Sequence, residues 1–325
     1  MANPMQRARI SIVVPFYNEE PGIADFENGI RPALDAVPDC DFEIVCVDDG
    51  SDDGTLARLH AAAARDPRYV VIGLSRNFGK EAALTAGIDH ASGDAVIPMD
   101  ADLQDPPELI RDLVAQWRDG AEIVLARRAD RSSDTFPKRV LSGLFYRIYN
   151  GLSDIELPEN VGDFRLMDRI AVEALKQLPE RQRFMKGLFA WVGFRTRSVE
   201  YTRPPRASGQ SRFTGLRLWN FALDGITSFS TLPLRIWSYI GAMGAIVSAA
   251  YGAYILLRTL VQGVDVPGYA SLLAATLFVG SMQLVSIGIL GEYIGRIYVE
   301  SKQRPRYIVR SKQTGAGLPR RPPQA

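Results

Sequence analysis

Short hydrophobic runs alternate with longer amphipathic stretches between residues 10 and 126 of the chain. The runs have the length of β-strands, and the stretches between them have the period of α-helices. Five runs predict strands, at residues 10–15, 42–47, 69–74, 95–99 and 122–126. The alternation predicts an α/β fold with a mainly parallel sheet whose strands are buried on both faces.

Each of these predicted strands is followed by polar or charged residues. Asp100 and Asp102 follow the run at 95–99, and Asp48 and Asp49 follow the run at 42–47. The carboxyl ends of parallel strands share one edge of the sheet, and open α/β proteins bind their ligands there. The pattern predicts a ligand crevice at this edge, although a lone D-x-D would also fit a solvated acidic turn.

Asp100 and Asp102 are two positions apart, so an extended chain directs both carboxylates to the same side. Carboxylate oxygens suit Mg²⁺ or Mn²⁺, above all where the phosphates of a substrate supply further oxygens. The chain has neither G-x-G-x-x-G nor G-x-x-x-x-G-K-[ST], which excludes the dinucleotide fingerprint and the P-loop. His60 and His90 lie in polar helical stretches, and we interpret them as solvated residues rather than metal ligands.

Two long segments without charged residues follow, at 236–257 and 266–291. Each is long enough to cross a hydrocarbon core of ~30 Å as a helix. The link between them carries Arg258 and Asp265, whereas the outer flanks are rich in Lys and Arg. The positive-inside rule therefore predicts two transmembrane helices, with the N-terminal domain and the C-terminal tail in the cytosol.

The spans divide the chain into a cytosolic domain at 1–210, a juxtamembrane amphipathic segment at 211–235, the two helices, and a basic tail at 292–325. The tail has eight Lys or Arg and two Glu, whereas the net charge of the whole chain is only +1. A basic tail after apolar helices suggests an anionic membrane surface and argues against nucleic acid. The basic stretch at 136–154 fits either a membrane-surface helix or a core-facing helix.

The chain has two cysteines, and no apolar segment precedes the first predicted strand. These features predict neither a disulfide framework nor a signal peptide.

Five motifs carry a resemblance to a known family. They are Val14-Pro15-Phe16-Tyr17-Asn18-Glu19, Val47-Asp48-Asp49-Gly50-Ser51, Asp100-Ala101-Asp102-Leu103-Gln104-Asp105, Gly162-Asp163-Phe164-Arg165, and the loop from Arg203 and Arg206 to Ser211-Arg212-Phe213. With the two spans, they resemble the glycosyltransferase family 2 enzymes that transfer a sugar to a polyprenyl phosphate. The chain looks most like the bacterial undecaprenyl-phosphate (bactoprenol-phosphate) glucosyltransferases, which are similar to dolichyl-phosphate mannose synthases. Arg212 stands where relatives often carry Lys.

The resemblance implies a nucleotide-sugar-binding domain of the glycosyltransferase A type. It also implies residues that bind the donor nucleotide, namely Pro15, Tyr17, Glu19, Asp49 and Asp100. Asp102 and Gln104, together with Asp100, would bind Mg²⁺ or Mn²⁺.

The resemblance further implies that Asp163 is the catalytic base and that Asp102 takes part in catalysis through the metal. Asp168 is better placed than Asp163 to cap the following helix, which leaves Asp163 available for another role. The acceptor phosphate would be bound by Arg203, Arg206 and Arg212.

The implied function is the inverting transfer of a hexose, first of all glucose from UDP-glucose, to undecaprenyl or another polyprenyl phosphate. The implied partners are a UDP-sugar, the polyprenyl phosphate, the lipid bilayer and further copies of the chain. We expect a multi-pass protein of the bacterial inner membrane whose catalytic domain and termini are cytosolic.

Three alternatives remain. A processive polysaccharide synthase of the same fold would have more spans and a Q-x-x-R-W motif, which this chain lacks. A non-catalytic scaffold or flippase partner would not need the D-x-D and Asp163. A sister transferase that uses GDP-mannose or another UDP-sugar fits the same motifs.

Overall fold

The computed structural model describes residues 7–129, 158, 160–181, 183–202, 230–262 and 268–315. These residues belong to two compact units. The first unit contains the described part of the N-terminal domain together with the residues from 304 to 315. The second unit contains two long helices.

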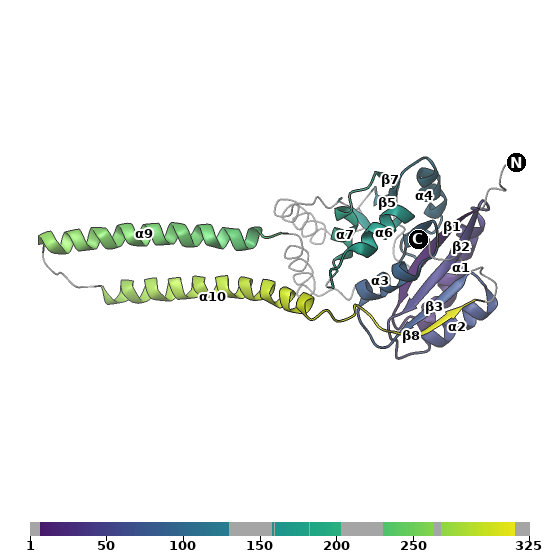
Figure 1. The fold of residues 1–325 in the computed structure, drawn as a ribbon, viewed down its shortest axis with the longest axis horizontal. Coiled ribbons are helices and arrows are strands. Elements are labelled where there is room, and N and C mark those ends of the chain that lie inside the picture. The colour runs from purple at the N-terminus through teal and green to yellow at the C-terminus, as the bar shows by residue number, and fades with distance from the viewer. Residues whose placement is uncertain are drawn as a thin grey trace. The chain divides into compact units, whose positions relative to one another are not determined.

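A sheet with the strand order β7-β5-β6-β4-β1-β2-β3-β8 forms the centre of the first unit (Figure 1). Its strands are β1 (Ala8–Phe16), β2 (Cys40–Asp48), β3 (Tyr69–Leu74), β4 (Ala95–Pro98), β5 (Ile123–Arg128), β6 (Val161–Asp168), β7 (Thr196–Tyr201) and β8 (Val309–Thr314). Four of the seven described pairings are parallel, and the other three involve β6 or β8. The predicted α/β fold with a mainly parallel sheet is confirmed.

The strands β1 to β5 correspond to the five predicted runs, whereas β6, β7 and β8 were not predicted. β8 lies within the segment that the sequence suggested to be a basic tail, and it pairs antiparallel with β3. Its residues are alternately half-buried and exposed, as expected of an edge strand. Such a polar strand lacks the apolar run that marks a buried one, so its place in the sheet is visible only in the folded chain (Figure 1).

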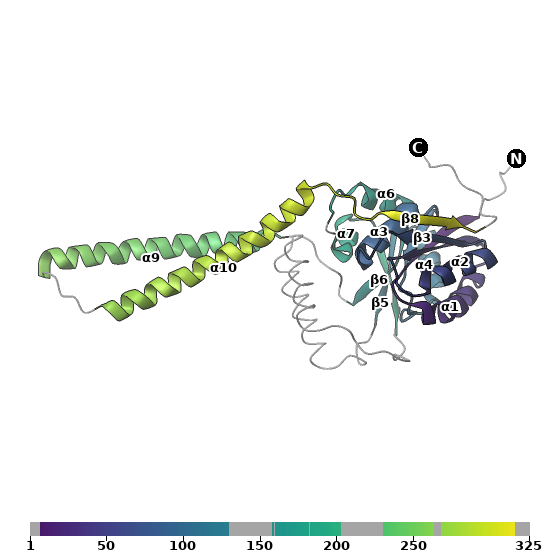
Figure 2. The ribbon, with the colours of Figure 1, turned by 90° about the horizontal axis from the view of Figure 1, so that it is seen from below.

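Helices cover both faces of the sheet (Figure 2). One face packs against α1 (Ile23–Asp35), α2 (Thr55–Arg65) and α4 (Leu109–Arg118), which share a hydrophobic core with β1 and β2. The other face carries α3 (Lys80–His90), α6 (Arg169–Gln177) and α7 (Met185–Trp191). A short 3₁₀ helix, Glu20–Gly22, precedes α1.

The central strand β1 shows why these runs are continuously apolar. Successive side chains of a strand point to opposite faces. Ile12 and Phe16 belong to the core that includes α1, whereas Val13 faces Gly87 of α3. Because both faces are buried, both alternating sets of side chains must be hydrophobic.

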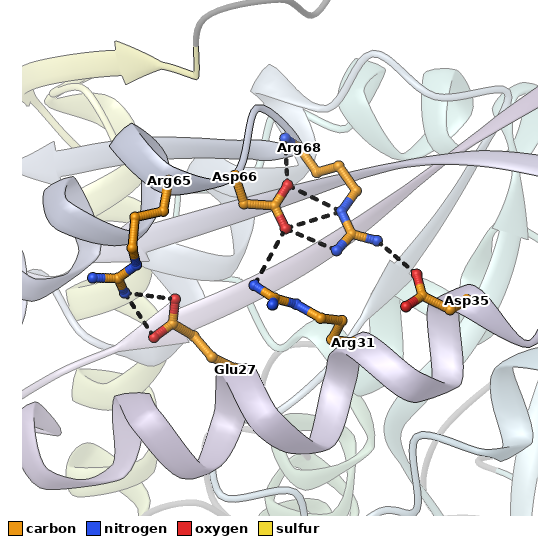
Figure 3. Close-up of polar contacts among 6 residues, drawn as sticks. All are labelled: Glu27, Arg31, Asp35, Arg65, Asp66 and Arg68. Carbon is orange, nitrogen blue, oxygen red and sulfur yellow. Dashed lines mark hydrogen bonds and ion pairs between the residues drawn. The ribbon is translucent and has the colours of Figure 1, made fainter.

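A cluster of ion pairs joins α1 to the end of α2 and to the turn before β3 (Figure 3). Arg68 lies 2.8 Å from Asp66 and 3.2 Å from Asp35, and Arg65 lies 3.0 Å from Glu27. Burial alone would raise the pKa of Asp66, but its bonds with Arg68 hold that pKa below the usual value. β3 begins directly after Arg68, so the cluster fixes the amino end of this strand.

The described part of the second unit is formed mainly by α9 (Leu232–Gln262) and α10 (Tyr269–Ser301), which lie side by side (Figures 1 and 2). α9 contains the predicted span 236–257, and α10 overlaps the span 266–291. Among the described residues, one stretch is long and apolar enough to cross a membrane, Ala275–Ser301. Tyr239–Ile255 is apolar but shorter, so the structure supports one candidate span of the two that were predicted.

Gly87 sets the distance between α3 and the sheet. A Cβ atom there would lie 2.2 Å from Cγ1 of Val13 and 3.2 Å from Cγ2 of Val47, and both valines are fully buried. Replacing a helix-interior glycine by alanine gains about 1 kcal/mol. Overpacking a core costs about 1–3 kcal/mol.

We expect the overpacking to dominate in a Gly87→Ala variant, because the two valines lie in central strands and have no room to move. The 2.2 Å contact places the overpacking cost near the upper end of its range, so after the helix gain is subtracted the free energy of unfolding should fall by about 2 kcal/mol, measured by denaturant unfolding in detergent. A variant as stable as the unchanged chain would contradict the close packing of α3 on β1.

Candidate active site

A cavity of about 300 Å³ lies at the carboxyl edge of the sheet, next to the neighbouring strands β1 and β4. The chain runs from β1 to β2 and β3 on one side of β1 and then returns to place β4 on its other side, so this is a topological switch point. Residues at or beyond the carboxyl ends of four strands line the cavity. They are Pro15, Phe16, Tyr17 and Glu19 at the end of β1, Asp49 after β2, Asn77, Gly79, Lys80 and Ala83 after β3, and Asp100, Ala101 and Asp102 after β4.

Six residues that the sequence singled out therefore line one cavity, namely Pro15, Tyr17, Glu19, Asp49, Asp100 and Asp102. Gln104 is not among the lining residues, but its backbone N–H donates to Oδ1 of Asp102 at 3.1 Å. Arg203, Arg206 and Arg212 lie outside the described residues, as do the stretch 136–154 and the segment 211–229.

Asp49 fixes the loop that follows β3. Its buried carboxylate accepts hydrogen bonds from the backbone N–H groups of Phe78, at 2.8 Å, and Gly79, at 2.9 Å. Burial raises the pKa of Asp49, and these two bonds oppose the shift. Gly79 has φ 98° and ψ 157°, a conformation that is open to glycine but strained for other residues. The loop thereby places Lys80 at the first position of α3, beside the cavity.

Lys80 connects Asp100 with Asp163. Its Nζ lies 2.6 Å from Oδ1 of Asp100 and 2.8 Å from Oδ2 of Asp163. β6 runs antiparallel to β4, with Ala95 opposite Asp168, and the same register extended along the strands brings Asp163 opposite Asp100. The amino end of β6 therefore delivers Asp163 to the edge where the carboxyl end of β4 delivers Asp100.

The three charged groups alter each other's pKa. The loss of surrounding water in the cleft raises the pKa of Asp100, although Lys80 opposes this shift. Burial would also raise the pKa of Asp163, but Lys80 and then Lys186 of α7 outweigh it and lower that pKa. Burial opposes the charge of Lys80, yet the two carboxylates hold its pKa above the usual value. Asp163 is thus an ionised carboxylate at neutral pH, in the form that can accept a proton.

Arg165 holds the backbone around Asp163. Its Nη2 donates to the carbonyl oxygen of Gly162 at 2.7 Å, and its guanidinium lies 4.2 Å from the ring centre of Phe189 in α7. Asp168 caps α6, because its carboxylate accepts from the backbone N–H of Ile170 at 2.9 Å. Asp163 is therefore not used as a helix cap.

Asp102 lies on an exposed turn that begins after β4. Leu103 has φ 48°, a left-handed conformation that is uncommon for residues with a branched side chain. The Leu103 side chain approaches Gly29 of α1 so closely that a Cβ on that glycine would lie 2.4 Å from it. This contact holds the turn in place and keeps Asp102 beside the cavity.

The carboxylates of the cavity fit a divalent ion that is coordinated partly by the chain and partly by a bound molecule. Within the described part of the chain, no three His, Cys, Asp or Glu side chains come together as a metal site. Asp100 and Asp102 offer hard carboxylate oxygens, which Mg²⁺ and Mn²⁺ prefer. Two carboxylates do not complete the coordination, so the phosphates of a ligand would have to provide further oxygens.

Sequence reasoning assigned no role to Lys80 or Glu81. The available signal in the sequence was Lys80 itself, at the start of the helical stretch that follows the third predicted strand, at residues 69–74. Its two carboxylate partners could not be identified from the sequence, since Asp163 is 83 positions away.

Glu81 is a titratable group next to this ion bridge. Burial, followed by repulsion from Asp163, raises the pKa of Glu81 from 4.5 to about 7. Above a pH of about 4.5 the unfolded chain ionises Glu81 while the folded chain keeps it neutral, so the folded state loses stability up to about pH 7.

We expect Glu81→Gln to remove this loss, because the amide is neutral and can still accept the hydrogen bond from the Met185 backbone. The variant should melt at a higher temperature than the unchanged chain near pH 8, and the difference should vanish near pH 4. Melting curves at several pH values check this, and equal melting temperatures near pH 8 would contradict it.

Two families match different parts of the chain. Residues 11–176 match glycosyl transferase family 2, and residues 232–297 match the GtrB C-terminal hairpin. The first match contains the cavity residues and Asp163. The second contains most of α9 and α10.

Relatives match nearly the whole chain. The bactoprenol glucosyl transferase of Shigella phage SfV is 53% identical over 305 residues, which are 94% of this chain and 99% of that protein. The prophage bactoprenol glucosyl transferase homolog of Escherichia coli strain K12 is 51% identical, over 93% of this chain and 98% of that protein. Among solved structures, a mannosyltransferase from Pyrobaculum calidifontis in complex with GDP-Man and Mn²⁺ is 18% identical, with a TM-score of 0.45 and coverage of 90% of this chain and 88% of that chain.

Proposed function

The chain belongs to glycosyl transferase family 2, and on this premise we propose that it transfers glucose from UDP-glucose to a polyprenyl phosphate at the cytosolic face of a membrane. The observation that carries the proposal is the 53% identity to a bactoprenol glucosyl transferase over almost the full length of both chains. The cavity agrees with this function, because it gathers the residues expected to bind the donor at the edge of an open α/β sheet.

The donor nucleotide would occupy the cavity beside β1. The side chain of Tyr17 is 42% exposed there and offers an aromatic ring to the nucleobase. The carboxylates of Glu19 and Asp49 line the same space and can accept hydrogen bonds from the base or the ribose hydroxyls. Pro15, another residue expected to bind the nucleotide, also lines the cavity.

Asp100, Asp102 and Gln104 would hold Mg²⁺ or Mn²⁺ together with the donor diphosphate. When bound, the ion would neutralise the negative charge that develops on the departing nucleoside diphosphate.

Asp163 would act as the base toward the acceptor. A polyprenyl monophosphate has a second pKa of ~6 and is mostly ionised near pH 7. Asp163 would accept the remaining proton and orient the phosphate oxygen that attacks the sugar. Attack of this oxygen on the anomeric carbon and departure of UDP form one displacement, so an α-linked donor gives a β-linked product.

The acceptor phosphate would be bound by Arg203, Arg206 and Arg212, since guanidinium groups suit bidentate contacts with phosphate. We further propose that α9 and α10 both cross the bacterial inner membrane and that both termini are cytosolic, as the charge distribution around them predicts. The lipid tail of the acceptor would remain in the bilayer, and a homo-oligomer would fit this arrangement.

The function is tested by incubating membranes that contain the protein with undecaprenyl phosphate and labelled UDP-glucose, UDP-galactose or GDP-mannose. We expect a labelled glycolipid with UDP-glucose, and its loss in excess EDTA. A product from GDP-mannose alone would favour the sister transferase, and a long glycan would favour a processive synthase. The absence of any product would support a non-catalytic scaffold.

The role of Asp163 is tested by Asp163→Asn, because the neutral amide cannot accept a proton. We expect kcat to fall by about 10²–10⁴-fold while the affinity for UDP changes little. Asp168→Asn is the matched control, since its amide keeps one oxygen for the cap of α6 but cannot also accept the hydrogen bond from the Trp117 indole, so it should lower stability while leaving kcat nearly unchanged. Normal kcat in Asp163→Asn would remove this residue from the mechanism.

A further inference from the structure

Lys80 is the one cation among the described residues that line the cavity. The remaining charged residues of the lining are acidic, namely Glu19, Asp49, Asp100 and Asp102. A nucleoside diphosphate carries two or three negative charges and would meet repulsion from these carboxylates. A divalent ion can offset part of this repulsion, and Lys80 supplies a positive charge that belongs to the chain itself.

The position of the ammonium group suits a phosphate ligand. An ammonium has three N–H donors, and the carboxylates of Asp100 and Asp163 account for two of them. The side chain of Lys80 remains 46% exposed although it takes part in two ion pairs. Lys80 lines the cavity, where a phosphate oxygen could accept the third N–H.

We propose that Lys80 binds a phosphate of the substrates, with its third N–H, while it stays paired with Asp163. The inference rests on the proposed function and adds a residue that the sequence motifs did not identify. When a cation takes up Asp100, the ammonium can exchange that carboxylate for a second phosphate oxygen. The ammonium of Lys80 then contacts both the leaving diphosphate and Asp163, the proposed base that acts on the acceptor.

Two groups of the substrates could accept the third N–H of Lys80, the diphosphate of the donor and the monophosphate of the acceptor. Lys80 shares the cavity with Tyr17 and Asp49, on the donor side, and contacts Asp163, on the acceptor side. Both ligands present phosphate oxygens to the same ammonium group, so the experiment treats them separately.

The test measures binding by calorimetry in EDTA, for the full-length protein in detergent. For the donor, the experiment compares the affinity for UDP with the affinity for uridine. The difference between the two affinities gives the contribution of the phosphates. The acceptor arm uses farnesyl phosphate compared with farnesol. The variants are Lys80→Met, which removes the charge at similar length, and Lys80→Gln, which keeps hydrogen-bond donors for the two carboxylates. Lys186→Met is the control, since Lys186 also affects Asp163 but does not line the cavity.

We expect both Lys80 variants to bind one of the two phosphate ligands about tenfold or more weakly, as the loss of a charge-assisted hydrogen bond implies. Binding of uridine and farnesol should be unchanged, which also shows that the variants are folded, and Lys186→Met should bind as the unchanged chain does. A selective loss for UDP assigns Lys80 to the donor, and a selective loss for farnesyl phosphate assigns it to the acceptor.

Unchanged affinity of either folded Lys80 variant for both phosphates would overturn the inference. If the unchanged chain still makes the glycolipid in that case, the proposed function stands and only the role of Lys80 fails. If the unchanged chain neither binds UDP nor forms a glycolipid, the proposed function itself fails.

Discussion

The ion bridge from Lys80 to Asp100 and Asp163 is the interaction on which the candidate site depends. It joins the carboxyl end of β4 to the amino end of β6, which run in opposite directions. Two carboxylates that face each other across neighbouring strands repel, and each favours protonation of the other. The ammonium between them keeps Asp163 ionised, which the proposed role of this residue as a base requires.

The backbone that carries Lys80 is held by contacts from the ends of other strands. Asp49, after β2, accepts hydrogen bonds from the loop that leads into α3. Gly50 has φ 66°, and a Cβ there would lie 2.3 Å from the backbone of Arg76, so the two loops pack directly on each other. Arg165 holds the opposite side through the carbonyl of Gly162. The site is thus formed by rigid strand ends, which position side chains better than free loops do.

The residues that follow the long helices contact the segment that carries Lys80. The backbone N–H of Ser75, at the start of the loop before α3, donates to the carbonyl of Ile308 at 2.9 Å. The hydroxyl of Tyr307 donates to Asp89, near the end of α3, at 3.0 Å. β8 continues along β3 from there. The helices α9 and α10 are therefore followed in the chain by a segment that contacts the loop and the helix beside the cavity.

The sequence by itself determined the strands β1 to β5 and the edge at which the cavity forms, because central parallel strands need continuous apolar runs and their polar ends mark a common edge. By the resemblance of its motif, the sequence also singled out Asp163 as a candidate base. Only the tertiary structure decided that β6 lies beside β4, that Lys80 joins Asp163 to Asp100, and that β8 forms the edge of the sheet next to β3. These arrangements depend on pairings between distant segments, and polar edge strands or single charged residues carry no local pattern that specifies their partners.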